Sequence, residues 1–426
     1  MAGPAGAVRR LVLPHRVPPG APACGQPHPD GRAVPSLAAG PPTQPAGAAC
    51  GGRRRRAARA GHRPHREAGT HRGLALNSSG LRKPFRLVVL CAALALSVAC
   101  SVKAEETSVL APPEHGAYVG VFSAGVEFEE DYFDAYAATA GREPAIVHTF
   151  ENWAEPVPLE KLRKIAGYGS VALITWEPWF GPAAPAPSLG EILDGRYDTY
   201  IRSWAEGLSR LGHTVLLRFA HEMNGDWFPW GGTENGADET GGFGSEIRSD
   251  GPERLVATWT YIHDIFEDEG ADNVTWVWAP NHNSVPEVPW NEMLEYYPGD
   301  HYVDWIGLTV YNVGDASDLL PWAEWRSFRE VLTPPYNVVA PLGKPIIIAE
   351  LGTAEGSGGK ATWIRDMGED IRLHFPEIKA IVWFDQDDRN LGDFRIATSL
   401  EARNAWSEIA TDQFFSQLPS AAEAGP

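Results

Sequence analysis

Two glutamates stand where apolar stretches of the sequence end abruptly. Glu222 follows His221, directly after the apolar stretch 215–219, and Glu350 closes the apolar stretch 346–349. A single glutamate at the end of a strand is often a structural ion-pair partner, here for a side chain such as Arg218. Two glutamates at the ends of two strands can instead act as one catalytic pair, in which the second carboxylate either attacks as a nucleophile or activates a water. We interpret Glu222 and Glu350 as such a pair.

The sequence lacks the motifs of a zinc metalloprotease and of a serine hydrolase, and residues 105–426 lack the cysteines that a thiolate metal site would need. The pair His221-Glu222 does not continue as His-Glu-x-x-His, because Gly225 occupies the place of the second histidine. No Gly-x-Ser-x-Gly nucleophile motif occurs, and all four cysteines precede residue 101. No His/Cys/Asp spacing typical of a metal site appears in the sequence, and we therefore expect neither a metal site nor a cofactor.

Eight apolar stretches, each ending in polar or aromatic residues, are predicted as strands. They cover 118–123, 145–150, 171–175, 215–219, 274–278, 305–310, 345–349 and 380–384. Helical patterns lie between them, over 159–165, 200–211, 255–265 and 361–373. This alternation predicts an α/β fold, a (β/α)₈ TIM barrel as a single catalytic domain over 116–411. An open doubly wound sheet is disfavoured, because residues 121–125 form no glycine-rich phosphate loop.

In such a barrel the carboxyl ends of all the strands form one ring. Polar and aromatic residues gather there: Glu151, Trp153, Trp176, Glu177, Trp179, His221, Glu222, Trp278, Asn281, Tyr311, Glu350, Trp383 and Asp385. Indole rings stack on the apolar faces of sugars, and paired carboxylates cleave glycosidic bonds. The ring therefore indicates a glycoside hydrolase. We expect Trp276 and Trp305 to face the core and Glu177 to be structural or to bind a sugar hydroxyl. Asp385 and His148 could take either role.

The charge of the chain changes sharply near residue 104. Residues 1–104 hold 16 of the 36 basic residues and only two acids, Asp30 and Glu67, whereas residues 105–426 hold 20 basic and 53 acidic side chains. All 16 tryptophans lie in the acidic part. Strong negative charge argues against nucleic acid or an anionic membrane as partner. We expect a neutral polysaccharide substrate, no partner protein and a monomer.

The segment 1–80 is rich in Pro, Ala, Gly and Arg, and we interpret it as a disordered or mis-assigned N-terminal extension rather than as a basic nucleic-acid-binding arm. Residues 81–104 read as a secretory signal peptide: a basic start over 81–86, an apolar stretch over 87–99 and a small-residue cleavage site at 102–104. The true start would then lie near residues 74–81. Cys100 offers a second interpretation, a lipoprotein anchor. In both cases we expect an exported protein.

Three further segments complete the predicted organisation. Residues 105–115 are expected to be a short linker, and residues 412–426 a disordered tail. The glycine-rich stretch 231–251 carries Glu234, Asp238 and Glu239. It could hold a cation or be a solvated surface loop, and we favour the loop.

With these residues identified, the chain resembles glycoside hydrolase family 26 over about 115–411. The motif Arg218-Phe-Ala-His-Glu-Met-Asn-Gly-Asp-Trp227 carries the resemblance, including His221 before the acid/base glutamate. The resemblance implies a retaining mechanism with Glu222 as proton donor and Glu350 as nucleophile. It also implies that Tyr311 bonds Glu350, that His221 contacts a sugar hydroxyl, and that Trp227 and Trp383 stack on sugars. We assign Trp230, Trp153, Trp176, Trp179, Trp278, Asn281 and Arg218 to the substrate-binding surface as well.

A general acid must keep its proton near neutral pH, and apolar neighbours such as Phe219 and Trp227 could raise the pKa of Glu222 enough. The family includes β-1,4-mannanases, mixed-linkage β-1,3-1,4-glucanases and β-1,3-xylanases. Phe219, Pro229 and Thr309 depart from the mannanase pattern. We nevertheless place mannan first because it is the commonest family activity, and mixed-linkage glucan second. A non-catalytic polysaccharide-binding barrel is the alternative from another functional class.

Overall fold

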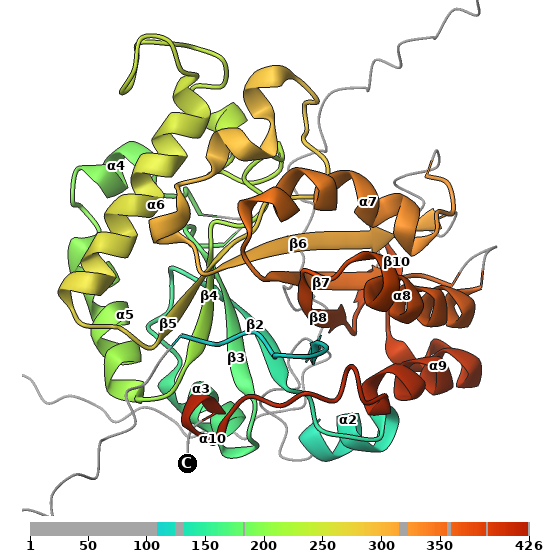
Figure 1. Ribbon diagram of the computed structural model, residues 1–426. Helices are drawn as coiled ribbons and strands as arrows, with labels where there is room; N and C mark the ends of the chain where they lie inside the picture. Colours follow the sequence, from blue (N-terminus) through green and yellow to red (C-terminus); the bar gives the residue numbers. More distant parts are fainter. Residues whose placement is uncertain are drawn as a thin grey trace, which may run out of the picture. The chain divides into compact units, whose positions relative to one another are not determined.

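The computed structural model describes residues 109–123, 132–181, 184–314, 323–355, 359–388 and 391–424. Eight parallel strands close into a barrel in which each strand pairs with its neighbours in chain order, and β8 pairs with β1 (Figure 1). The predicted (β/α)₈ fold is therefore confirmed. The predictions for residues 1–104 lie outside the described part of the chain.

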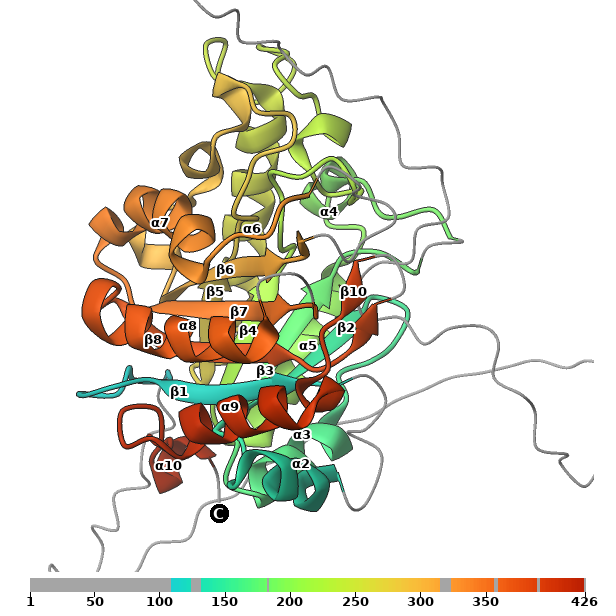
Figure 2. The same ribbon diagram turned by 90° about the vertical axis from the view of Figure 1, so that its right-hand side faces the viewer.

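All eight predicted strands are present, with ends that differ by a few residues. They are β1 (Tyr118–Phe122), β2 (Ile146–Asn152), β3 (Val171–Glu177), β4 (Val215–Phe219), β5 (Val274–Trp278), β6 (Trp305–Asn312), β7 (Ile346–Thr353) and β8 (Ile378–Phe384). The helices are α2 (Tyr132–Ala140), α3 (Leu159–Gly167), α4 (Leu189–Leu193), α5 (Asp198–Leu211), α6 (Asp250–Asp268), α7 (Phe328–Val339), α8 (Lys360–His374), α9 (Leu400–Thr411) and α10 (Ala421–Ala424). A short hairpin of β9 (Asp387–Asp388) and β10 (Gly392–Asp393) follows β8 (Figure 2).

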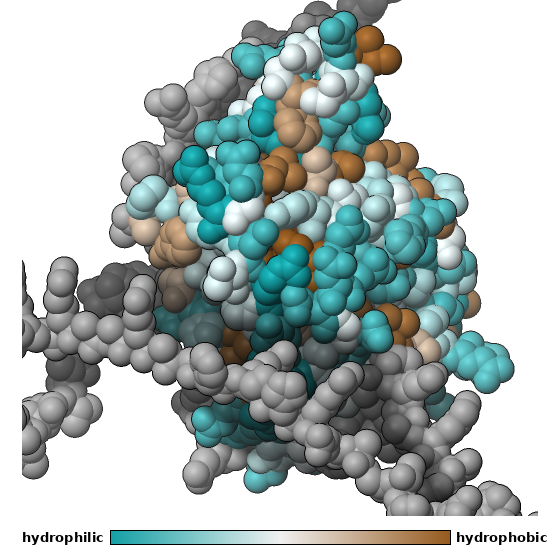
Figure 3. Space-filling view, turned by 90° about the vertical axis from the view of Figure 1, so that its left-hand side faces the viewer, coloured by the Kyte–Doolittle hydropathy of each residue, from teal (hydrophilic) through white to brown (hydrophobic). Residues whose placement is uncertain are grey.

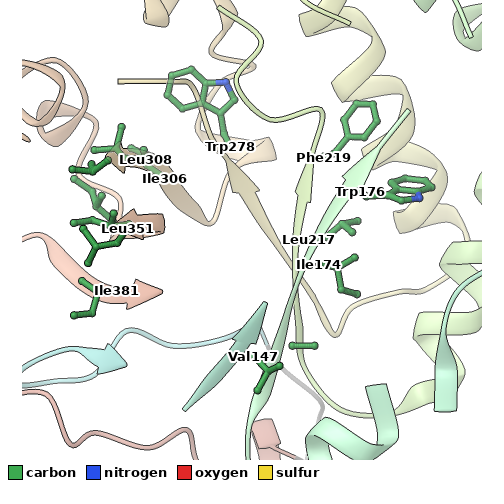
Figure 4. Close-up of a cluster of buried hydrophobic side chains, with 14 of the residues drawn as sticks. Val147, Ile174, Trp176, Leu217, Phe219, Trp278, Ile306, Leu308, Leu351 and Ile381 are labelled. Carbon is green, nitrogen blue, oxygen red and sulfur yellow. The ribbon is translucent and has the colours of Figure 1, made fainter. Parts of the chain in front are cut away.

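Successive side chains of each strand point alternately into the barrel and out toward the helices. The outward side chains of β3 and β4, among them Ile174, Trp176, Leu217 and Phe219, pack in the large core between strands and helices (Figure 4). The inward side chains form a second, smaller core, to which Leu173, Leu216, Val277, Ile347 and Val382 belong. The two cores explain why the strands read as continuous apolar stretches.

This alternation corrects the prediction for four tryptophans. Trp176, Trp278 and Trp383 occupy outward positions of their strands and are fully buried, and Trp153 is 2% exposed beside Trp176. Trp383, for example, packs against Trp406 of α9. None of the four indoles presents a face to a sugar. The prediction placed them by the end of the strand alone and did not consider which side of the sheet they occupy.

A β-bulge gives Glu350 its direction. Ile346 and Ile348 point outward, so regular alternation would also point residue 350 toward the helices. The pairing of β6 with β7 shifts here: Leu308 is paired with Ile348, but the next residue, Thr309, is paired with Glu350. The extra residue of β7 turns Glu350 into the barrel, which is a recurrent use of bulges at active sites.

The amino-terminal end of the barrel is closed by chain segments from outside the strands. The buried Leu110 belongs to the inner core, its N–H donates to Thr275 Oγ1 (2.7 Å), and its carbonyl accepts from Trp305 Nε1 (2.9 Å). Glu423 accepts from the N–H of Ala111 (2.8 Å). The described part of 105–115 is thus more than a linker, and the prediction of a disordered tail is wrong through residue 424.

The outer face over α5 and α6 is mostly hydrophilic, with scattered apolar residues (Figure 3). In the described ranges, no helix combines the length and the hydropathy that a membrane span requires.

The close pairing of β1 with its neighbours yields a stability prediction. A Cβ added at Gly120 would lie 2.6 Å from the Ile146 carbonyl oxygen and 2.8 Å from Ile146 Cβ, atoms that cannot move without shifting β2. We expect Gly120→Ala to lower the free energy of unfolding by about 1–3 kcal/mol. Urea unfolding followed by tryptophan fluorescence measures this loss.

Gly190→Ala in α4 is the matched control, because nothing lies within 4 Å of a Cβ there. It should leave stability unchanged or raise it by up to about 1 kcal/mol. Equal stability of the two variants would contradict this account of β1.

Candidate active site

Arg218 points into the barrel from β4 as a fully buried cation. It is the inward residue of β4 next to the strand end, and its side chain is 0% exposed. Its Nη1 donates to Glu350 Oε1 (2.5 Å) and Thr175 Oγ1 (3.2 Å), and its Nη2 donates to Thr309 Oγ1 (3.0 Å). A buried cation needs such a paired and hydrogen-bonded environment to offset its desolvation. Arg218 therefore connects β3, β6 and β7 to β4.

Glu350 is fixed through both of its carboxylate oxygens. Oε1 accepts from Arg218, and Oε2 accepts from the Tyr311 hydroxyl (2.7 Å). The side chain is 2% exposed. The predicted contact of Tyr311 with Glu350 is present, and the two donors come from separate strands. Such two-sided support holds a carboxylate in one orientation, as a positioned nucleophile requires.

Glu222 sits just beyond β4 on a strained backbone. Its φ is 53°, and that of Ala220 is 46°, in the left-handed region that non-glycine residues rarely adopt. The Glu222 N–H donates to the Ala279 carbonyl (2.8 Å), which holds the turn against the end of β5. Conformations of this kind cost about 1–3 kcal/mol each and recur where a side chain must be aimed.

The surroundings of Glu222 raise its pKa to about 7. Burial is the main cause, followed by the negative charge of Glu350, while Arg218 and hydrogen bonds from Thr309 and Trp227 act in the opposite direction. Trp227 Nε1 donates to Glu222 Oε2 (2.8 Å). Glu222 is therefore protonated in an appreciable fraction of molecules at neutral pH, as a general acid must be.

A third carboxyl group, Glu177, lies within the same electrostatic environment. It is the inward residue that ends β3, is 3% exposed, and accepts from Trp179 Nε1 through Oε2 (3.0 Å). Burial raises its pKa to about 8, and the charges of Glu350 and Glu222 add to this effect. Its Oε1 has no protein partner. Glu177 is therefore a mainly neutral acid near pH 7, with one buried oxygen that has no protein partner.

Two buried histidines border the carboxyl groups. The pKa of His148 and that of His221 lie well below the ordinary value because of burial and, second, the charge of Arg218. His148 Nε2 is 2.7 Å from Thr175 Oγ1, and the Nδ1 atom of each ring has no protein partner. Both rings are neutral at pH 7. Together with Glu177 Oε1, they offer unpaired polar atoms of the kind that sugar hydroxyls satisfy.

Two further residues predicted to bind substrate, Trp227 and Trp230, differ in how much of the side chain is exposed to solvent. Trp227 is 42% exposed, and it can lie over Gly225 only because that residue lacks a side chain: a Cβ there would stand 2.4 Å from the indole. Trp230 is 1% exposed, donates to the His221 carbonyl (2.7 Å) and stacks on Phe228. Trp227 is thus available to stack on a sugar, whereas Trp230 supports His221 from behind.

Trp179 and Asn281 also shape the site from the side. Trp179 is 8% exposed, and its Nε1 donates the hydrogen bond to Glu177 Oε2 that fixes this carboxyl group. Asn281 exchanges hydrogen bonds with Asn224: its N–H donates to Asn224 Oδ1 (2.7 Å), and its carbonyl accepts from Asn224 Nδ2 (3.0 Å). Asn281 therefore joins the loop after β4 to the end of β5.

Sequence reasoning did not identify Thr175 and Thr309 as partners of Arg218, and it left the role of Glu177 open. The alternation along β3 could have identified Thr175 and Glu177, because they lie two and four residues after the inward Leu173 and therefore also point into the barrel. Asp385 accepts from the Ile396 N–H (2.6 Å) and braces the connection after β8. Within the described ranges, the acids of residues 231–251 form no group of three that could hold a cation.

The charge arrangement predicts how the pKa of Glu222 responds to two substitutions. Glu350→Gln removes a nearby negative charge and leaves Arg218 without its carboxylate partner, so the pKa of Glu222 should fall below 7. Trp227→Phe removes a hydrogen bond that favours the charged form, so the pKa should rise.

Carbon-13 NMR of glutamate side-chain carboxyls over pH 4–9 measures both shifts, with the Glu222 signal assigned by its absence in Glu222→Gln. Glu369→Gln, on the exposed surface of α8, is the control and should leave the titration unchanged. Shifts of the same sign in both variants would contradict this electrostatic account.

Comparison with known proteins identifies the family. The family model described as "Glycosyl hydrolase family 26" matches residues 190–388. Endoglucanase H of Acetivibrio thermocellus is 34% identical over 287 residues, which are 67% of this chain and 29% of that protein. A mannan endo-1,4-beta-mannosidase of Bacillus subtilis is 30% identical over 196 residues, 45% of each chain.

The chain thus spans less than half the length of these two relatives. Among solved structures, a GH26 beta-mannanase from Bacteroides ovatus has 16% identity and a TM-score of 0.48, and the match covers 71% of this chain and 90% of that one. The segment 190–388 that matches the family model contains Arg218, Glu222 and Glu350. The chain belongs to glycosyl hydrolase family 26.

Proposed function

We propose that this chain is an endo-β-glycanase that cleaves mixed-linkage β-glucan by double displacement. The observation that carries the proposal is the unequal environment of two glutamates in one site. Glu350 is paired with Arg218 and bonded by Tyr311, while burial raises the pKa of Glu222 to about 7. One carboxyl is thus placed as a nucleophile and the other as an acid, which is the division of roles in retaining glycosidases.

In the first step, Glu350 attacks the anomeric carbon as Glu222 donates its proton to the leaving glycosidic oxygen. The bond to that oxygen breaks, and a glycosyl ester of Glu350 forms. Once the aglycone has left, Glu222 is ionised and accepts a proton from water. The water oxygen then attacks the anomeric carbon and releases Glu350, so the product retains its configuration.

The change of charge during this cycle fits the surrounding residues. When Glu350 becomes an ester, its negative charge disappears, and the pKa of Glu222 should drop because that charge is one of its causes. A lower pKa suits the second step, in which Glu222 must begin as a base. Arg218, still held by Thr175 and Thr309, further favours ionised Glu222 at this stage.

Two observations favour glucan over mannan and reverse the order expected from sequence. The relative with 34% identity over 67% of this chain is named an endoglucanase. In addition, Thr309 stands where mannanases tend to have an aspartate, and its neutral hydroxyl accepts from Arg218 (3.0 Å). An aspartate there would compete with Glu350 for the guanidinium. Mannan is the second candidate substrate, favoured by the 30% identity to a mannan endo-1,4-beta-mannosidase.

Substitution of each glutamate tests the mechanism. We expect Glu350→Ala to reduce hydrolysis to background, because no covalent ester can form. Glu222→Ala should reduce kcat on polysaccharide by about 10²–10⁴-fold but affect an aryl glycoside with a good leaving group much less. Initial rates of reducing-sugar release, and product anomers followed by NMR, provide the measurements.

The matched control is again Glu369→Gln, which should keep wild-type rates. Full activity of Glu350→Ala, or an initial product of inverted configuration, would rule out double displacement. A wild-type chain that binds glucan without releasing sugar would instead support the non-catalytic alternative.

A substrate panel tests the choice of glucan. Lichenan, β-1,4-mannan and β-1,3-xylan should give the highest kcat/KM for lichenan, with oligosaccharides of several lengths as early products. Thr309→Asp should lower kcat/KM on lichenan, because the new carboxylate competes for Arg218. Higher kcat/KM on mannan in the wild-type chain would replace glucan by mannan and leave the mechanism intact.

A further inference from the structure

A group of metal-binding side chains lies on α6, away from the glutamates of the active site. His263, Asp264 and Glu267 each offer one ligand atom, and these atoms all lie within 4.8 Å of one another. No other such group of three occurs in the part of the chain that the structure describes. His263 and Glu267 are four residues apart, so they occupy the same face of the helix.

His263 supplies an observation independent of the grouping. Its side chain is 7% exposed, packed beside Trp276 (5.1 Å between ring centroids) and Tyr302 (5.0 Å). Its Nδ1 is buried and has no hydrogen-bond partner. Asp264 Oδ1 lies 4.0 Å from this nitrogen, which is too long for a hydrogen bond. Burying an imidazole nitrogen without a partner is costly, and a bound cation would satisfy it.

A second imidazole approaches from another part of the chain. His301 belongs to the short helix η5 (Asp300–Tyr302), and its Nε2 lies 4.0 Å from Glu267 Oε1. The His301 side chain is 71% exposed, so it is free to rotate, and its ring centroid is 5.8 Å from that of His263. His263, Asp264 and Glu267 already lie together on α6, and rotation of the exposed His301 side chain would add a second imidazole from η5.

The donor set selects the class of ion. Zinc and similar transition metals accept imidazole nitrogen together with carboxylate oxygen, usually four ligands in a tetrahedron at about 2.0–2.2 Å. Calcium and magnesium prefer oxygen ligands alone. Ligands around zinc lie about 3.3–3.6 Å apart by this geometry. The ligand atoms of His263, Asp264 and Glu267 lie within 4.8 Å of one another, so side-chain rotations must bring them closer before they share one ion.

We propose that His263, Asp264 and Glu267, completed by His301, bind one zinc-class divalent ion that ties α6 to the connection between β5 and β6. Trp259 Nε1 of α6 already donates to the Tyr302 carbonyl (3.3 Å), so the two segments are in contact at this point. Two carboxylates neutralise the double positive charge of the ion.

The position of this site assigns it a stabilising role. Helix η5 directly precedes β6, so the site lies near the amino-terminal ends of the strands, opposite the end that carries Glu222. An ion that binds only the folded chain raises its stability. The inference is therefore independent of the proposed glycanase activity, and either can fail without the other.

Zinc titration of the full chain after removal of metal by a chelator tests the site. We expect isothermal calorimetry to show one equivalent of zinc that is absent or at least about tenfold weaker in Glu267→Gln and in His301→Ala. Both substituted side chains are exposed, so neither change should prevent folding. Zinc at about 100 times its Kd should raise the Tm of the wild type by about 5 °C, and this rise should shrink in both variants.

His374→Ala and Glu369→Gln, two exposed positions of α8, are the matched controls and should keep the wild-type equivalent. They leave the histidines of residues 1–104 unchanged, as do the test variants, so binding there cancels in the comparison. Magnesium at the same concentration should not raise the Tm. Zinc binding that is equal in Glu267→Gln, His301→Ala and the wild type, or a wild type without the saturable equivalent, would overturn the proposal.

Discussion

The buried guanidinium of Arg218 is the constraint on which the active site depends. A fully buried cation is tolerated only where charge and hydrogen bonds offset its lost hydration. Glu350 supplies the charge, and Thr175 and Thr309 supply two hydroxyl acceptors. These partners come from three other strands, so the ion pair fixes the inner geometry of the barrel as well as the orientation of one carboxylate. Removal of Glu350 would leave Arg218 as an uncompensated charge.

One cation cannot balance three carboxylates in a buried space, and the site resolves this by protonation. Glu350 takes the guanidinium, whereas Glu222 and Glu177 interact with it only at longer range, and their pKa values are raised to about 7 and about 8. Burial and unequal interaction with a single cation thus give the three carboxyl groups different protonation. The buried His148 and His221 follow the same rule, because a second cation beside Arg218 is unfavourable.

Apolar stretches and their spacing predicted the eight strands, the barrel and the two glutamates, because each of these leaves a local signal. Two features without a local signal were not predictable. The bulge in β7 that turns Glu350 inward depends on its pairing with β6, and Trp383 at a strand end is identical in sequence terms whether it faces a sugar or α9. The side of the sheet that Trp383 faces follows from the alternation along the whole of β8. Ile381, two residues earlier, also points outward toward the helices. The packing of Phe415 and Glu423 against the barrel likewise arises from contacts distant in sequence.

The two ends of the barrel carry opposite kinds of structure. At the carboxyl end, Ala220 and Glu222 have strained backbones, and Glu177 and the two histidines hold unpaired polar atoms. Each of these features lowers the stability of the fold. The strained backbones orient the Glu222 side chain, and the unpaired polar atoms lack a hydrogen-bond partner within the protein. At the amino end, Leu110 is hydrogen-bonded to Thr275 and Trp305, and Glu423 accepts a hydrogen bond from Ala111, which joins the segment after α9 to the segment before β1. Strained conformations persist only where the surrounding structure is stable enough to hold them. The satisfied hydrogen bonds of the segments before β1 and after α9 contribute to that stability, although they lie at the end of the barrel opposite the glutamates.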